Sequence, residues 1–139
     1  SDTYQRIDWQ AYTAEGTSTT VLSTYHNTAD GWYLCLPDSW VDRVLFTRST
    51  SSGESTVTFA YREDGSGDLK EFLKISALTG SSREVNATRG SRVVLSRQAE
   101  TIFTAELLES NTTWEYGVSE DEVRELFRLI VPEWTTGDN

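Results

Sequence analysis

Short runs of β-prone residues, separated by polar turns, recur along this chain of 139 residues at intervals of about ten residues. In the clearest run, Val57, Phe59 and Tyr61 alternate with Thr and Ala and would share one face of a strand. Many short strands joined by short turns are typical of an antiparallel meander. We therefore expect strands at 7–11, 20–25, 32–36, 44–48, 56–62, 72–78, 92–97 and 101–108.

The stretch Trp32 to Leu36 is the most apolar of these runs. Both of its faces are apolar, with Trp32, Leu34 and Leu36 on one and Tyr33 and Cys35 on the other. Such a strand usually lies in the middle of a sheet or is covered on both faces. We expect it to be the most buried strand of the fold.

One amphipathic helix is predicted from Glu120 to Val131, just before Pro132. Ser119 and Glu122 have the spacing of an N-terminal capping box. The apolar residues that follow recur at spacings of three and four and form one stripe, which must pack on an apolar surface. They are Val123, Leu126, Phe127, Ile130 and Val131.

These elements predict a single α+β domain over residues 1–139. A mostly antiparallel sheet of about six to eight strands would pack one face against the C-terminal helix. The expected core is Leu34, Leu36, Phe46, Val57, Phe59, Leu73, Ile75, Val94, Phe103, Leu107, Val123, Leu126, Phe127 and Ile130.

The net charge of −10 argues against nucleic acid or anionic lipid as partners, because an acidic surface repels phosphate groups. No apolar run reaches the length of about 18 residues that a membrane-spanning helix needs. About a quarter of the residues are Ser or Thr, and Arg greatly outnumbers Lys. With a single cysteine as well, this composition favours an exported bacterial domain.

No catalytic, metal-binding or cofactor-binding motif stands out. Cys35 and His26 are the sole cysteine and histidine, too few ligands for structural zinc. As a nucleophile and base they are disfavoured, because Cys35 lies within an apolar strand. The loop Asp64 to Asp68 lacks the glycine and glutamate positions of an EF-hand. Carboxylates for acid–base catalysis cannot be singled out among the 22 acidic residues.

The five tryptophans are the best indication of a binding function, because aromatic side chains bind sugars and peptides as well as filling cores. Trp32 belongs to the apolar strand, and Trp134 should pack near the end of the helix. Trp9, Trp40 and Trp114 lie near predicted loops or edges. We expect these three to be the ligand-binding residues.

The segment Gly31 to Trp40 resembles the glycine, apolar strand and Leu-Pro-x-x-Trp segment of cell-envelope proteins and lipoproteins of Gram-positive gut bacteria. The segments Phe127 to Ile130 and Glu133 to Gly137 are similar to the tail of the same group. In that group such a domain can follow calcium-binding, propeller-type repeats, so residues 1–25 would belong to the edge of a preceding module. The layout also resembles the PsbP/Mog1 type of fold. These segments carry no catalytic residues.

We therefore expect a non-catalytic binding or accessory domain of a larger cell-envelope protein, secreted or anchored at the cell surface. Its partner would be a protein or a glycan, and it would need no cofactor. Two alternatives stay open. One is a hydrolase with two facing carboxyl groups in a concave pocket, and the other is a structural spacer.

Overall fold

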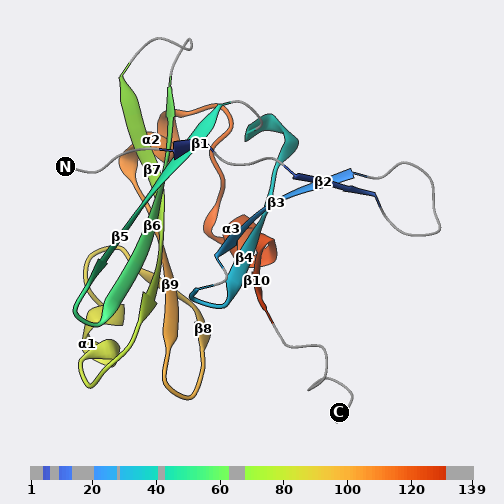
Figure 1. The fold of residues 1–139 in the computed structure, drawn as a ribbon. Helices are drawn as coiled ribbons and strands as arrows, with labels where there is room; N and C mark the ends of the chain where they lie inside the picture. Colours follow the sequence, from blue (N-terminus) through green and yellow to red (C-terminus); the bar gives the residue numbers. More distant parts are fainter. Residues whose placement is uncertain are drawn as a thin grey trace.

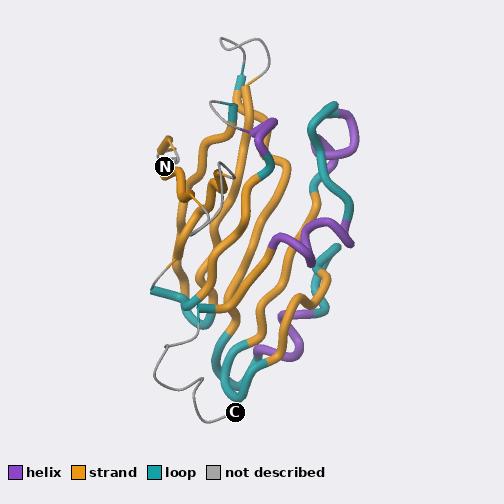
Figure 2. The backbone as a smooth tube through the Cα atoms, turned by 90° about the vertical axis from the view of Figure 1, so that its right-hand side faces the viewer, coloured by secondary structure: helices purple, strands orange, loops and turns teal. Residues whose placement is uncertain are grey.

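The computed structural model describes residues 5–6, 10–13, 21–27, 29–40, 43–62 and 68–130. Within these ranges the chain is mostly antiparallel β-structure, arranged in two sheets with short helical segments (Figures 1 and 2). The two sheets have the strand orders β1-β5-β6-β7-β9-β8 and β10-β4-β3-β2. The strands are β1 Gln5–Arg6, β2 Gln10–Thr13, β3 Val21–Asn27, β4 Trp32–Leu36, β5 Val44–Ser51, β6 Glu54–Arg62, β7 Leu69–Leu78, β8 Val93–Arg97, β9 Ile102–Leu107 and β10 Phe127–Leu129.

The broad α+β prediction and the antiparallel sheet are confirmed, but the strands form two sheets rather than one. The four-stranded sheet packs on the six-stranded one through aromatic side chains. Tyr25 of β3 contacts Phe46 and Phe59 of the larger sheet, with ring centroids 4.9 and 5.5 Å apart. Phe103 of β9 contacts Phe127 of β10 at 5.6 Å. A second sheet, more than a helix, therefore covers the apolar face.

Strand β4 is internal to its sheet, as expected, and its burial alternates. Trp32, Leu34 and Leu36 are buried in the main core, whereas Tyr33 and Cys35 are half-buried on the opposite face. Within the described part of the chain, only one face of β4 is therefore fully covered. The strand is central because β3 pairs with one of its edges and β10 with the other.

The predicted helix is shorter than its apolar stripe suggests. The capping box is confirmed, since Ser119 Oγ accepts from Glu122 N and Glu122 Oε1 accepts from Ser119 N, at 3.1 and 2.8 Å. However, α3 ends at Leu126 (Glu120–Leu126), and Phe127 begins strand β10 with extended backbone. The apolar residues of 127–129 also fit strand alternation, and pairing with β4 satisfies backbone groups that would otherwise be left at a sheet edge.

Nine of the predicted core residues are buried in the main core. Ile130, near the end of the predicted helix stripe, is not buried. Ile130 is exposed at 37%, because the chain has left the helix before reaching it. Phe46, Leu107 and Leu126 are half-buried against the main core, and Val94 packs in a second cluster beside Leu78, Ala87 and Ile102.

The sequence did not predict two short helices, α1 (Arg83–Ala87) and α2 (Glu109–Thr113). Neither has a side-chain N-cap bond, and α2 consists largely of Ser, Asn and Thr, which favour helices poorly. A 3₁₀ turn, Asp38–Trp40, also follows Pro37 at the end of β4. The predictions for Ile7 to Trp9, the loop Asp64–Gly67 and the stretch from Val131 onward lie outside the described residues.

Candidate functional site

Trp40 lies in the core, so the expectation that it is exposed is wrong. The 3₁₀ turn after Pro37 folds the indole back onto the large sheet, where it has no exposed surface. Its ring packs edge-to-face on Phe72 at 5.1 Å, and its Nε1 donates a hydrogen bond to the Tyr116 carbonyl at 3.0 Å. With both its surface and its donor used internally, Trp40 cannot serve as an open platform.

Trp114 is half-buried at the same end of the molecule, following α2. One face of the indole is stacked on Tyr61, with centroids 4.1 Å apart and planes 5° apart. Phe72 contacts it at 4.9 Å and Trp40 at 6.3 Å. The structure thus brings two of the three predicted tryptophans together, but as a packing cluster. Trp9 lies outside the described residues.

His26 and Cys35 lie on adjacent strands but not opposite each other. The register places Cys35 across from Thr24 and His26 across from Tyr33. The imidazole stacks on the Tyr33 ring at 5.0 Å, and its Nδ1 is 3.2 Å from Thr24 Oγ1. These contacts with Tyr33 and Thr24 give no indication of a base poised beside Cys35.

A polar hollow of about 370 Å³ lies where the turn between β3 and β4 approaches the β5–β6 hairpin. Figure 1 shows both turns at the same end of the two sheets. Among the described residues of the lining, Asp30, Arg48 and Glu54 are charged and the apolar side chains are alanines. The remaining wall carries glycine and hydroxyl groups. The described lining residues are Ala29, Asp30, Arg48, Thr50, Ser51, Gly53, Glu54, Ser55, Ala77, Thr79 and Thr101.

Asp30 is fixed in this hollow by hydrogen bonds. Its Oδ2 accepts from Ser55 Oγ at 2.6 Å and from Asn27 Nδ2 at 3.0 Å. The buried Asn27 also accepts the Asp30 backbone N–H, at 3.1 Å, and so ties the turn to itself. Arg48 Nη2 lies 3.8 Å from the same carboxylate oxygen, close enough for an ion pair but too far for a hydrogen bond.

Tyr25 lies in the core beneath this charged pair. Burial raises the pKa of its hydroxyl above the ordinary value of 10.0, since a buried phenolate would lose its hydration. Arg48 lowers this pKa and Asp30 raises it, which shows that both charges act on the ring. The net effect keeps the Tyr25 hydroxyl neutral, so it contributes no negative charge to the hollow.

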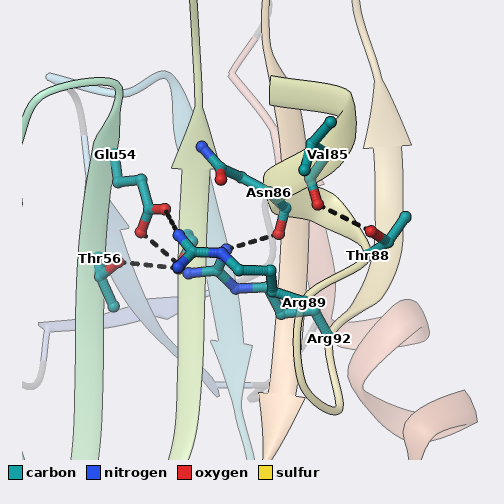
Figure 3. A network of polar contacts seen from close by, with 8 residues as sticks. Glu54, Thr56, Val85, Asn86, Thr88, Arg89 and Arg92 are labelled. Carbon is teal, nitrogen blue, oxygen red and sulfur yellow. Dashed lines mark hydrogen bonds and ion pairs between the residues drawn. The ribbon is translucent and has the colours of Figure 1, made fainter. Parts of the chain in front are cut away.

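Glu54 ties the β5–β6 hairpin to the segment after α1 (Figure 3). Its Oε1 accepts from Arg92 Nη2 at 2.9 Å and its Oε2 accepts from Arg89 Nη2 at 2.8 Å. Arg92 also donates to the Asn86 carbonyl at 2.7 Å. The hydrogen bond from Arg92, with the charges of both arginines, lowers the pKa of Glu54 although desolvation opposes the change.

We expect Glu54→Gln to lower the free energy of unfolding at pH 7 by about 1.5–3 kcal/mol, because Arg92 would lose a charged partner. The pKa of Glu54 is depressed by folding, so this stabilisation is complete above the ordinary value of 4.5. It should disappear as the pH falls through the folded-state pKa. Chemical denaturation of both proteins between pH 7 and pH 2 measures the difference.

Glu84→Gln is the matched control for this prediction. Glu84 pairs with Arg97, but both side chains are more than half exposed. An exposed pair contributes little, so the change should cost no more than about 1 kcal/mol. Equal losses for the two variants, or a Glu54 effect that persists unchanged at pH 2, would contradict the account of Glu54.

No family model, curated protein or solved structure matches this chain. Among the described residues, no helix is long and apolar enough to cross a membrane. The hollow itself could not be read from the sequence, since it combines residues from two sheets. The nearest sequence signal is Asn27-x-x-Asp30-Gly31, an asparagine and an aspartate flanking a turn.

Proposed function

We propose that this chain is a non-catalytic binding domain that works outside the cytoplasm, as part of a larger cell-envelope protein, and that the polar hollow is its ligand site. The observation that carries the proposal is the Asp30–Arg48 pair. Asp30 is fixed by two hydrogen bonds, while the Arg48 side chain is 39% exposed at the wall of the hollow. In ligand sites, a few placed polar or charged groups of this kind fix the orientation of the ligand.

The composition and the resemblance support the extracytoplasmic part of the proposal. A Ser- and Thr-rich acidic chain with one cysteine suits an exported bacterial domain. The Gly31 to Trp40 segment, which resembles cell-envelope proteins, directly follows Asp30. The partner's binding group would therefore be displayed outside the cell, on a glycan or a protein.

A carboxylate-based hydrolase fits the hollow less well. Such an enzyme needs one carboxyl group that stays protonated near its working pH. Two acidic residues line the hollow, but the pKa of Glu54 is lowered by its arginine partners, which is the wrong direction for a general acid. The second alternative, a structural spacer, leaves the exposed Arg48 guanidinium without a role.

A glycan array, with purified envelope polysaccharide as a second probe, tests the proposal when a blocking variant is included. Ser51 is exposed and lines the hollow, so Ser51→Trp should abolish binding by filling it. Ser91→Trp places the same indole at another exposed position and should bind normally. Binding that survives Ser51→Trp, or no binding by the folded wild-type chain to either probe, would contradict the proposed function.

A further inference from the structure

The guanidinium of Arg48 retains free hydrogen-bond donors. It makes no hydrogen bond to any other described residue, and its ion pair with Asp30 is 3.8 Å long. A guanidinium carries five N–H donors in a planar fork that matches a carboxylate. The wall of the hollow thus presents a cation whose donors point to no protein acceptor within the described structure.

Asp30 lies beside this cation without occupying its hydrogen-bond donors, so it does not compete strongly with a ligand for them. Its Oδ2 already accepts hydrogen bonds from Ser55 and Asn27. Asp30 therefore holds its charge near Arg48, while the direct donors of Arg48 stay available. The Asp30 side chain, held by these two hydrogen bonds, loses little conformational freedom when a ligand binds.

The charge balance around the hollow also favours an anion. The two carboxylates of the lining are both ion-paired. Asp30 pairs with Arg48, and Glu54 pairs with Arg89 and Arg92. The charged lining residues Arg48, Asp30 and Glu54 sum to −1, and the two arginines bound to Glu54 bring this ion-paired set to +1, whereas the whole chain carries −10. A negatively charged group would meet less repulsion here than over the rest of the surface.

The rest of the lining indicates a hydroxylated ligand. Five of the described lining residues carry hydroxyl groups, which can donate and accept hydrogen bonds, although Ser55 already donates its proton to Asp30. A ligand with a large apolar group would find little to contact, because alanines supply the apolar side chains among the described lining residues. The volume of about 370 Å³ is near the lower end for ligand sites and suits one small unit. The five are Thr50, Ser51, Ser55, Thr79 and Thr101.

We infer that the hollow binds a carboxylated sugar unit, such as a uronic acid residue of an acidic polysaccharide, with its carboxylate on Arg48 and its hydroxyls against the Ser and Thr wall. This inference rests on the proposed function, because it names the ligand class of the same site.

Isothermal titration and amide chemical-shift mapping test it with three probes: methyl glucuronide, methyl glucoside and acetate. Methyl glucoside removes the carboxylate and acetate removes the sugar. We expect methyl glucuronide to bind at least about tenfold more tightly than either and to shift the amides of residues 29–30, 50–55 and 101. Arg48→Gln should weaken it by about tenfold or more.

Arg43→Gln is the matched control, because Arg43 is an exposed arginine away from the hollow. Its guanidinium lies 4.5 Å from the Tyr116 ring centroid, in the aromatic cluster of Trp40, Tyr61, Phe72, Trp114 and Tyr116. It should leave binding unchanged, and thermal melts confirm that both variants are folded. Loss of binding in Arg43→Gln but not in Arg48→Gln would overturn the assignment.

The failure of this inference can be told apart from failure of the proposed function. Equal binding of methyl glucoside and methyl glucuronide in the hollow would overturn the carboxylate requirement and leave a binding domain. If methyl glucuronide does not bind but an array ligand still shifts the backbone amides that line the hollow, the assignment of an acidic sugar is overturned and the proposed binding function stands. No shift of those amides by any probe or array ligand would overturn both.

Discussion

Replacing Phe127 by alanine is expected to lower the free energy of unfolding by about 3–5 kcal/mol. Phe127 is 7% exposed and begins the strand that pairs with β4. Its ring lies 5.7 Å from Trp32 in its own sheet and 5.6 Å from Phe103 in the facing sheet. Its removal would leave a cavity at the junction of the two sheets. Urea denaturation monitored by tryptophan fluorescence measures the loss.

Ile130→Ala is the control that separates the observed fold from the predicted helix. A helix through Val131 would put Phe127 and Ile130 on the same apolar stripe, and both changes would be severe. In the structure Ile130 is 37% exposed, so its truncation should cost no more than about 1 kcal/mol. Equal large losses for the two variants would contradict strand β10 and restore the longer helix.

Replacing Asn111 by alanine is expected to cost roughly 1–3 kcal/mol for each backbone group that it leaves unpaired. The buried amide of Asn111 donates from Nδ2 to the Val118 carbonyl at 2.7 Å and accepts from the Val118 N–H at 2.8 Å. These two bonds fix the chain between α2 and α3. The thermal midpoint and the denaturant midpoint should both fall.

Thr113→Ala provides the comparison, since Thr113 is exposed in the same short helix. Its hydroxyl makes only a 3.3 Å bond to the Ser110 carbonyl, so the change should be nearly neutral. Gly117 supports the same account independently, because a Cβ there would lie 2.0 Å from the Asn111 carbonyl oxygen. A neutral Asn111→Ala variant would show that the segment before α3 is held in some other way.

The sequence predicts local features of this fold better than long-range ones. Alternation at Val57, Phe59 and Tyr61 is a local property of a strand, and all three are buried as expected. The capping box of Ser119 and Glu122 depends only on residues three apart, and it forms. Such patterns predict the type of element and where it begins, but not that Thr58 and Ala60, on the other face of β6, are buried as well.

Where tertiary contacts decide the outcome, the sequence patterns are ambiguous. Phe127 suits both the predicted helix stripe and a strand face, and pairing with β4 decides for the strand. Trp40 looks like an exposed loop residue until the turn after Pro37 returns it to the core. Division into two sheets likewise depends on contacts such as Tyr25 with Phe46, which no local pattern contains.

The candidate site was predicted least well, for the same reason. Tryptophan density pointed to Trp40 and Trp114, but one is buried and the other is stacked on Tyr61. The hollow instead combines Asp30 from a turn of the small sheet with Arg48 from a strand of the large sheet. These two residues stand 18 positions apart, and only the packing of the sheets brings their charges together.

The most direct test of the central claim is to map which backbone amides respond when the chain binds an acidic polysaccharide fragment. Binding in the hollow predicts shifts centred on Asp30, Gly53, Ser55 and Thr101, which are lost in Arg48→Gln. Shifts centred instead on residues 114–116, and retained in Arg48→Gln, would contradict it and place the ligand site on the aromatic cluster.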